Sequence, residues 1–418
     1  MTEWRKVKLG DICSIKSGKR LPKGADFSSC PTENKYIRAR DIKNGVINGE
    51  DLAFISNEVK ERISKYIVNT NDVIVTIAGT IGEVAFVTSQ YDGVNLTENA
   101  IRLTDFDHEV NSKYIFYTLR SNDYYEHMQK IAGGAAQPKM GIYKVEAISI
   151  DLPSVDTQER IVDILSRYDA LIENYQRQIK LLEEAAQRLY KEWFVDLHFP
   201  GHQSTPIINN LPQSWQKKTV EECLIFHGNG GWGKDSPTGK YEHPGKVIRG
   251  TDIEDIKTGR YNDLPLRFHT DNDIKKRTLK NNDLVFELSN GNINNIGRCL
   301  LIDDIILNNT GDNTICASFC KLLRPIDRFH ALMLYWEIQD MQTSGRMLPL
   351  KKQGANGINN FDFDGFLSHV LLIPSDESLI SPLEVITKNI GRTLGEIALL
   401  SEARDRLLPK LMSAEIEV

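Results

Sequence analysis

The chain has 418 residues and a formal net charge of −6, with 51 Lys and Arg against 57 Asp and Glu. At about 100 to 200 residues per domain, this length allows two to four domains with cores of their own. A composition of 40% hydrophobic and 26% charged residues excludes a disordered or fibrous chain. The acidic balance, taken alone, argues against a nucleic-acid binder, because a DNA duplex is a dense line of negative charge.

Cysteine spacing and the first residues indicate the cellular setting. The six cysteines include no CxxC pair, so neither a disulfide framework nor a zinc site is indicated. The segment that begins at Met1 lacks the apolar core of a signal peptide, and no apolar run reaches membrane-spanning length. We therefore expect a reduced, cytoplasmic protein with no membrane partner.

The two halves of the chain match each other at a nearly constant offset. The offset is 211 residues from Trp4 to Asn71 and grows to 221 at Pro153. Insertions in surface loops produce such small steps, whereas chance matches do not keep one offset over some 70 residues. The matched positions include Trp4 and Trp215, Ile37-Arg38 and Ile248-Arg249, Asn71-Asp72 and Asn282-Asp283, and Pro153 and Pro374.

Each half begins with a β-rich segment, 1–152 in the first half and 201–373 in the second. Short apolar runs such as 73–77 and 284–286 are separated by Asn, Asp and Gly, which is typical of strands joined by turns. We interpret each segment as a mixed α/β globular domain.

A helical pattern over 153–200 follows the first globular domain. Its apolar and aromatic residues recur every seven positions, the period of a helix that packs along another helix. Asp156, supported by Glu159, is predicted to cap its start. The predicted contact row is Ile161, Tyr168, Tyr175, Leu182, Leu189 and Trp193, and the row between is Ile164, Leu171, Gln178 or Ile179, and Ala185.

The segment 374–418 repeats this pattern after the second globular domain, although Arg404 interrupts its apolar row. A single apolar stripe must be buried, and the other helix is the obvious partner. Helices related by a two-fold axis would run antiparallel, and about 40 residues make a rod of roughly 60 Å. The alternative is that the helices only dimerise the protein or complete its core. The second contact row is Leu383, Ile390, Ile397, Leu407 and Leu411.

Motifs that look chemical are incomplete. Residues 228–235 fit the spacing of a phosphate-binding loop, but Asp235 stands where a Ser or Thr that holds magnesium is required. The triplets 58–60 and 255–257 each place a carboxylate near a Lys, as in half of a nuclease metal site. Cys316 and Cys320 lie in an apolar stretch, which favours buried side chains over metal ligands. No catalytic constellation and no metal site are predicted.

Several short segments in a fixed order carry a family resemblance. The segments are Trp4, Leu9-Gly10-Asp11-Ile12, Ser17-Gly18-Lys19, Tyr36-Ile37-Arg38, Gly79-Thr80-Ile81-Gly82, 133–138 (GGAAQP), Gln158-Glu159-Arg160-Ile161 and 406–413 (RLLPKLMS). Through these segments the chain resembles, end to end, the DNA-specificity subunits of type I restriction-modification systems.

The resemblance implies an α+β fold with two tandem target-recognition domains, separated by two long antiparallel helices that form a coiled-coil-like spacer. Each domain would read one half of a bipartite site in double-stranded DNA. The helices, in 153–200 and 374–418, would set the gap between half-sites and bind two modification (methyltransferase) subunits. Motor-nuclease subunits would join them.

The resemblance also implies that this chain catalyses nothing and binds no cofactor itself. S-adenosylmethionine, ATP and Mg would belong to the partner subunits, whose complex methylates adenine and cleaves DNA. The second half departs from the pattern at 231–233 and 353–357, and Leu379 replaces Gln158. We therefore expect the two halves of the DNA target to differ.

Candidate DNA contacts are Arg, Lys, Asn, Gln and Thr side chains in the predicted loops, because such groups read base edges and bind phosphates. Arg38 and Arg249 equally suit bracing the fold through Asp41 and Asp252. The candidates are Lys19, Arg20, Lys23, Arg38, Arg40, Lys43, Gln137 and Lys139 in the first domain, and Asn229, Lys234, Arg249, Thr251, Lys351, Lys352, Gln353, Asn356 and Asn359 in the second.

Two rival functions stay open. One is a stand-alone duplicated DNA-binding or antirestriction decoy protein, which would bind DNA tightly without a partner. The other is a cryptic nuclease or nucleotide hydrolase, whose activity would require Glu58 or Lys234.

The net charge of −6 is unevenly distributed between the globular domains and the helical segments. Residues 1–150 hold 20 basic and 19 acidic side chains, and residues 201–372 hold 20 of each. The helical segments 151–200 and 373–418 hold 6 against 10 and 5 against 8. The acidity therefore lies in the helices, and a DNA-binding face must come from local clustering of cations in nearly neutral domains.

Overall fold

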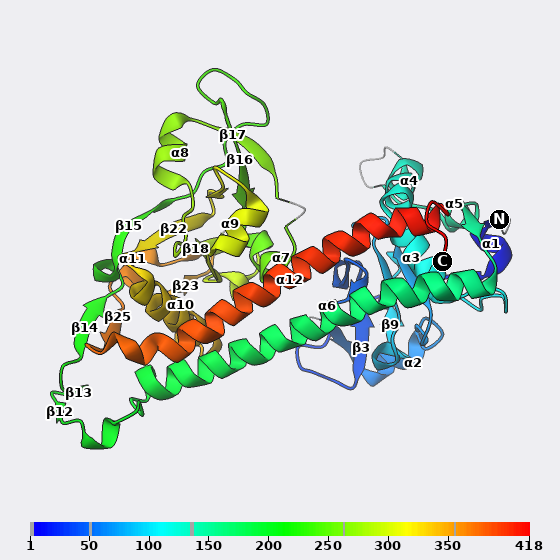
Figure 1. Cartoon of the computed structure of the whole chain (residues 1–418). Coiled ribbons are helices and arrows are strands. Elements are labelled where there is room, and N and C mark those ends of the chain that lie inside the picture. The colour runs from blue at the N-terminus through cyan, green and yellow to red at the C-terminus, as the bar shows by residue number, and fades with distance from the viewer. Residues whose placement is uncertain (1–3, 50–51, 134–137, 262–263, 355–356) are drawn as a thin grey trace. The chain divides into compact units, whose positions relative to one another are not determined.

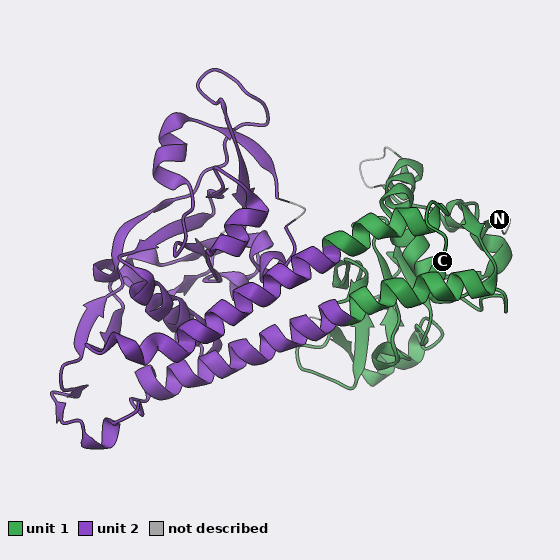
Figure 2. Ribbon diagram, in the orientation of Figure 1, with its two compact units in different colours: residues 1–170, 402–418 green, residues 171–401 purple. Residues whose placement is uncertain are grey.

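The structure, a computed structural model, describes residues 4–49, 52–133, 138–261, 264–354 and 357–418 (Figure 1). The chain divides into two compact units, coloured separately in Figure 2. Unit 1 comprises residues 1–170 and 402–418, and unit 2 comprises residues 171–401. Each unit contains one β-rich part and a section of each of two long helices.

The central sheet of unit 1 has four antiparallel strands in the order β2-β10-β7-β8. All four residues of β7 are buried, as expected for an apolar strand that is covered on both faces. Helix α3 packs against β7 and β8. The strands are β2 (Ser14–Ser17), β7 (Val73–Thr76), β8 (Val84–Phe86) and β10 (Ala100–Thr104).

Smaller sheets complete the β-rich part of unit 1. In the order β6-β3-β9, strand β3 pairs with β9 in parallel and with β6 antiparallel. The other pairs are β1-β11 and β4-β5. The elements are β1 (Arg5–Lys8), β3 (Asn34–Ile37), β4 (Ile42–Lys43), β5 (Val46–Ile47), β6 (Ala53–Ile55), β9 (Asn95–Leu96), β11 (Ser149–Leu152), α1 (Leu9–Ile12), α2 (Asn57–Arg62), α3 (Ser112–Arg120), α4 (Asn122–Ala132), α5 (Ile142–Glu146), and the 3-10 turns η1 (Ala39–Asp41) and η2 (Ser89–Tyr91).

Unit 2 repeats this plan with its own sheets. Its four-stranded sheet has the order β15-β22-β18-β20, and β17-β16-β21 again combines one antiparallel and one parallel pair. The sheet β19-β24-β23 is added, beside the pairs β14-β25 and β12-β13. The strands are β12 (Ile207–Ile208), β13 (Leu211–Pro212), β14 (Gln216–Thr219), β15 (Leu224–Asn229), β16 (His243–Ile248), β17 (Leu266–His269), β18 (Leu284–Glu287), β19 (Ser289–Asn290), β20 (Cys299–Leu301), β21 (Ile315–Cys316), β22 (Cys320–Pro325), β23 (Lys351–Lys352), β24 (Asn359–Phe361) and β25 (Val370–Ile373).

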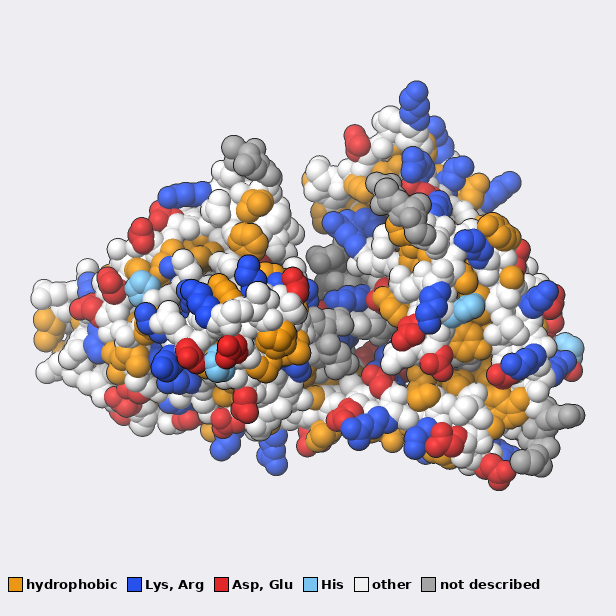
Figure 3. All heavy atoms as spheres, turned by 90° about the horizontal axis from the view of Figure 1, so that it is seen from above, with side chains coloured by type: hydrophobic (Ala, Val, Ile, Leu, Met, Phe, Trp, Pro, Cys, Tyr) orange, Lys and Arg blue, Asp and Glu red, His pale blue; other side chains and the backbone are white. Residues whose placement is uncertain are grey.

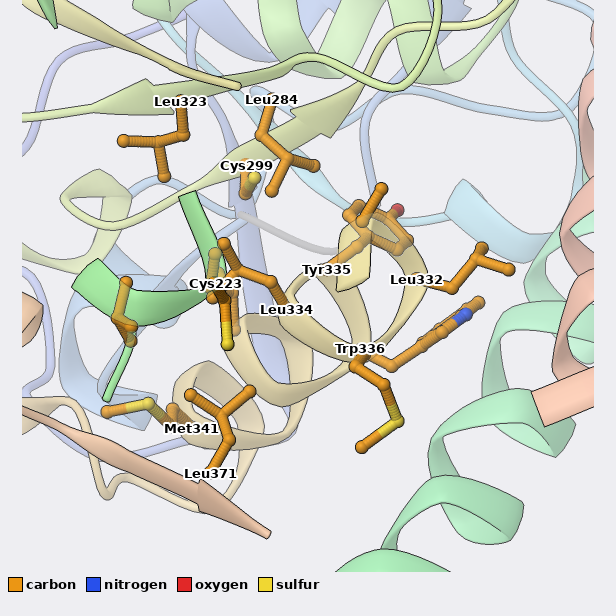
Figure 4. Packing of buried hydrophobic residues seen from close by; sticks show 14 of the residues in the cluster. Cys223, Leu284, Cys299, Leu323, Leu332, Leu334, Tyr335, Trp336, Met341 and Leu371 are labelled. Atoms are coloured by element: carbon orange, nitrogen blue, oxygen red, sulfur yellow. The ribbon is translucent and has the colours of Figure 1, made fainter. Parts of the chain in front are cut away.

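Helix α10 carries the main core of unit 2. It is buried on nearly all sides, and Figure 4 shows Trp336, Leu334 and Met341 among side chains from several strands. Burial raises the pKa of Cys316 to about 12, in agreement with the predicted role of this thiol as a small core residue. The helices are α7 (Ile253–Lys257), α8 (Asp271–Arg277), α9 (Asp304–Thr310), α10 (Arg328–Thr343) and α11 (Phe363–Leu367), with the 3-10 turns η4 (His202–Ser204), η5 (Glu221–Cys223), η6 (Gly250–Asp252), η7 (Ile293–Asn295), η8 (Leu348–Leu350) and η9 (Glu377–Ile380).

The duplication extends to individual ion pairs. In unit 1 the guanidinium of Arg102 on β10 lies 2.8 Å from the carboxylate of Asp72, which precedes β7. In unit 2 Arg324 on β22 lies 2.7 Å from Asp283, which precedes β18. The predicted α+β fold with an internal duplication is therefore confirmed.

Two long helices run antiparallel to each other, green and red in Figure 1. Helix α6 (Val155–Tyr190) has 36 residues and continues as a π-helical turn, η3 (Lys191–Val195). Helix α12 (Ser381–Met412) has 32 residues. In unit 2 they share an apolar cluster in which Ile172 and Ile179 meet Leu394 and Ile397. In the part of the chain that the structure describes, no helix is long and apolar enough to cross a membrane.

The buried row of α6 differs from the predicted one. Ile161 is buried, but Tyr168, Tyr175, Leu182, Leu189 and Trp193 are half-buried, and Leu171 is exposed. The buried residues instead form a row with a spacing of seven residues. This row lies one position after the intermediate row predicted at Ile164, Leu171 and Ala185. The reason is that α6 packs against both α12 and the globular parts, which widens and shifts its buried stripe. This row is Leu165, Ile172, Ile179 and Ala186.

The predicted cap of α6 was also wrong. The helix begins at Val155, so Asp156 lies inside its first turn. Ser154 stands before the helix, and its Oγ accepts a 3.4 Å hydrogen bond from the backbone N of Thr157. In α12, Leu383, Ile397 and Leu411 are buried as predicted, whereas Ile390 and Leu407 are half-buried.

Candidate nucleic-acid interface

A close backbone approach fixes the first predicted loop of unit 1. The backbone N of Gly18 donates to the carbonyl of Ala100 at 3.1 Å, and that of Lys19 to Leu96 at 2.8 Å. A Cβ on Gly18 would lie 2.1 Å from the carbonyl oxygen of Thr97. Only glycine fits here, so the chain turns tightly against the 96–97 segment and places Lys19 in solvent.

The second loop is held by a bidentate ion pair. The guanidinium of Arg38 donates to both carboxylate oxygens of Asp41 at 2.9 Å, and the backbone N of Arg38 donates at 2.8 Å. The Asp41 side chain is only 2% exposed. Arg38 therefore braces the loop, as the sequence allowed, whereas Arg40 is 72% exposed beside it.

Further loops join the same group of contacts. The carbonyl of Asn99 accepts from the backbone N of Ile77 and of Ala78, and Ala78 forms a β-bridge with Lys139. The hydroxyl of Thr80 donates to Ala39 at 3.4 Å. We call these five connected loops, residues 18–20, 38–43, 77–80, 97–99 and 138–140, the first rim.

Several predicted contacts thus lie on or beside one rim. Lys19, Lys23, Lys43 and Lys139 are exposed. The guanidinium of Arg20 forms an ion pair with the carboxylate of Glu98 at 3.0 Å. Gln137 lies outside the described residues.

Unit 2 builds a second rim from equivalent contacts. Gly230 donates to the carbonyl of Cys320 at 3.0 Å, and a Cβ on Gly230 would lie 2.2 Å from the carbonyl oxygen of Ala317. The backbone N of Ala317 donates to Ile248, as that of Thr97 does to Ile37 in unit 1. We call the described segments 229–234, 249–251, 288–290, 317–319, 351–354 and 357–360 the second rim.

A second bidentate pair holds the second rim. Arg249 donates to Asp252 through Nε at 2.9 Å and through its backbone N at 2.7 Å. Arg249 therefore braces its loop as Arg38 does in unit 1. Asn229 and Thr251 are exposed beside it.

The remaining candidates of unit 2 differ in how far the fold engages them. The Nζ of Lys234 lies 5.7 Å from the ring centroid of Tyr241, and Lys352 pairs with Asp362 at 2.9 Å. Burial lowers the pKa of Lys351, which is half-buried.

Three amide residues complete the predicted set, and the structure describes two of them. Gln353 is exposed, whereas Asn359 is buried and its amide nitrogen donates to the carbonyl of Gly291 at 3.0 Å. Asn359 is thus used inside the fold. Asn356 lies outside the described residues.

Sequence reasoning missed an aromatic residue of the second rim. Trp232 is 41% exposed, and the Cζ of Arg267 lies 4.7 Å from its ring centroid. Its signal was a large apolar residue inside a Gly-rich loop. On the face seen in Figure 3, Lys and Arg are interspersed with Asp and Glu, so any DNA surface depends on local groups.

The described residues hold no group of three or more His, Cys, Asp or Glu side chains placed to bind a metal ion. The phosphate-loop-like segment 228–235 forms the end of β15 and an irregular loop, and Asp235 pairs with Arg267. The helix whose N-terminus would bind phosphate is absent after this described segment.

Comparison with known proteins supplies the family. Residues 1–184 match the family described as the type I restriction modification DNA specificity domain. The MjaIX specificity subunit of Methanocaldococcus jannaschii is 24% identical over 330 residues, covering 74% of this chain and 70% of that protein. These matches confirm the predicted resemblance to type I restriction-modification specificity subunits. The EcoKI specificity subunit of Escherichia coli K12 is 23% identical over 400 residues, covering 91% of this chain and 82% of that protein.

A solved structure agrees on the fold of this chain. The crystal structure of the S subunit of a type I restriction-modification system from M. genitalium superposes with a TM-score of 0.51 at 16% identity. The match covers 98% of this chain and 96% of that one. The predicted family and fold are both confirmed.

Proposed function

We propose that the chain is the DNA-recognition subunit of a type I restriction-modification complex. Its target-recognition domains are 1–152 and 201–373, and each reads one half of a bipartite DNA site. The helical segments 153–200 and 374–418 set the gap between half-sites and dock two modification subunits. Motor-nuclease subunits complete the assembly. The names of the relatives, all type I specificity subunits, support this assignment.

The observation that carries the proposal is the construction of one rim twice. Gly18 and Gly230 make the same close approach to a neighbouring loop, and Arg38 and Arg249 make the same brace. The side chains around these fixed points differ between the rims. Two rims with a common backbone arrangement and different side chains are suited to reading two different half-sites, because base edges are distinguished by their pattern of hydrogen-bond donors and acceptors. The half-sites should therefore differ.

The chain itself contributes no catalytic step in this proposal. S-adenosylmethionine, ATP and Mg act on the partner subunits, in the cytoplasm. Because Arg20 and Lys352 are paired with carboxylates, the rims offer fewer unpaired cations than the sequence suggests. We expect the isolated chain to bind DNA weakly and the partners to supply much of the electrostatic attraction.

The test is a methylation map of DNA after reaction with the chain and its modification subunits. The expected result is one bipartite, asymmetric site. Exchange of residues 1–152 for those of another specificity subunit should change one half-site and leave the other. A change in both halves would contradict independent reading. Tight, partner-independent binding by the purified chain would favour the stand-alone decoy protein instead.

A further inference from the structure

The loop that carries Trp232 is fixed on both sides. Before the indole, Gly231 donates to the carbonyl of Cys316 at 2.8 Å. After it, Lys234 and Phe268 exchange two backbone hydrogen bonds, of 3.0 and 2.9 Å. Gly233 has a φ of 68°, which suits glycine. The exposure of Trp232 therefore belongs to a defined loop conformation and does not come from a frayed segment.

Arg267 holds the indole from β17. Its Nε donates to the backbone carbonyl of Trp232 at 3.2 Å while its guanidinium lies over the ring. The Arg267 side chain is only 11% exposed and is also paired with Asp235. Arg267 is thus occupied within the protein, and the indole is the part of this pair that faces solvent. A fixed, exposed aromatic loses little conformational entropy on binding, which is the usual property of an interface anchor.

The position of Trp232 in the duplication places it on the candidate interface. Gly230 occupies the place of Gly18, so Trp232, two residues later, occupies the place of Arg20. One cation from another segment lies close to this loop: a Cβ on Gly231 would lie 2.9 Å from a guanidinium nitrogen of Arg277, which is paired with Asp273 at 2.6 Å. The second rim has an apolar surface where the first has a cation, while positive charge stays close.

We propose that Trp232 contacts apolar surface of duplex DNA in the half-site read by unit 2, and that Arg267 is a positioning residue for this indole. The inference rests on the proposed function and adds a contact of a different chemistry. Duplex DNA offers apolar surface in two places, the thymine 5-methyl group and the deoxyribose. The exposed Lys234 in the same loop favours a nucleic acid over an apolar protein partner, because its charge attracts phosphates.

The experiment uses the full chain assembled with its modification subunits and measures affinity for three DNAs: the intact site, and sites with either half scrambled. Trp232→Ala should weaken binding to the intact site about 10-fold or more, the scale of one lost base contact. Arg267→Lys keeps the charge but loses the planar fork, so it should weaken binding by a smaller factor. If Trp232→Ala fails to assemble, Trp232→Gln is used instead, because it removes the indole but keeps a long polar side chain at this position.

Ile326→Ala is the matched control. Ile326 is 44% exposed, and its backbone N donates to Cys223, next to the start of β15, whereas Trp232 follows the end of that strand. This substitution should leave affinity unchanged within about twofold.

The outcomes separate the two proposals. If the wild-type complex binds all three DNAs with equal affinity, the proposed function and this inference are both overturned. Wild-type binding that depends on both half-sites, with Trp232→Ala equal to wild type, overturns this inference alone. Replacing each thymine of the second half-site by uracil then assigns the contact. If uracil at one position weakens binding of the wild-type complex but does not further weaken binding of Trp232→Ala, the indole contacts the methyl group of that thymine. If uracil weakens binding at no position, the indole contacts deoxyribose.

Discussion

Arg404 of α12 forms a 2.7 Å ion pair with Asp169 of α6, between the Nη1 and Oδ1 atoms. The hydroxyl of Tyr117 also donates to Asp169 at 2.7 Å, and the guanidinium of Arg120 lies 3.5 Å away. Tyr117 and Arg120 belong to α3, so one carboxylate connects both long helices to the globular part of unit 1. The residue that interrupts the apolar row in the sequence is thus a buried, paired contact.

Substitution of this carboxylate should destabilise the fold. Asp169→Asn removes the carboxylate that the guanidinium groups of Arg120 and Arg404 share and leaves Arg404 with Asp405 as its partner. Breaking such a buried pair costs about 3 kcal/mol. Arg404→Met should cost less, because Asp169 keeps Arg120 and Tyr117 as partners. Urea denaturation measures both free energies of unfolding. Glu173→Gln on exposed α6 surface is the control, and equal costs for all three substitutions would contradict the account.

The same group should give a defined pH dependence. Burial alone would raise the pKa of Asp169, but Arg120 and Arg404 hold it below its ordinary value. A carboxyl whose pKa is lower in the folded state stabilises the fold above its unfolded pKa, near about 3.9, and loses this contribution as the pH falls through the folded pKa. The difference in unfolding free energy between wild type and Asp169→Asn should stay constant from about pH 5.5 to 8 and shrink below about pH 4. A difference that grows on acidification would contradict this assignment.

Removal of one exposed cation should affect one half-site only. Arg40 is 72% exposed on the first rim, so Arg40→Ala should weaken binding of the assembled complex by about 1 to 3 kcal/mol if it reads a base, with relaxed preference at that base pair. A phosphate contact would instead give a uniform loss and a smaller salt dependence. Arg62→Ala, an exposed Arg on α2, is the control for charge alone. A changed preference in the second half-site would contradict separate reading.

Lengthening the helices should lengthen the gap. One turn of four residues inserted after Ala170, with four more after Ser401, adds length at the junctions between the two units and leaves the contacts inside each unit in place. The added rise is about 6 Å, which corresponds to about two base pairs. A methylation map should show both half-sites unchanged and the unread gap longer. An unaltered gap would refute the spacer role.

Much of the architecture follows from local pattern. Asn71 and Asn282 precede their strands with φ values of 73° and 74°, as expected for matched turn residues 211 positions apart. The long helices were predictable because apolar residues recur with a helical period. Their exact buried row was not, because Ile172 is buried against the other long helix whereas Leu165 and Ala186 are buried in clusters with the globular parts.

The duplication, the two helices and the family resemblance were predictable from the amino-acid sequence, since each depends on order, spacing and periodicity along the chain. Which candidate side chains face solvent depends on the folded structure. Arg20 meets Glu98, Asn359 is bonded to Gly291, and Arg404 meets Asp169, 235 positions earlier. Charge pairing and burial depend on residues far apart in the chain, and no local pattern records which of them the fold brings together.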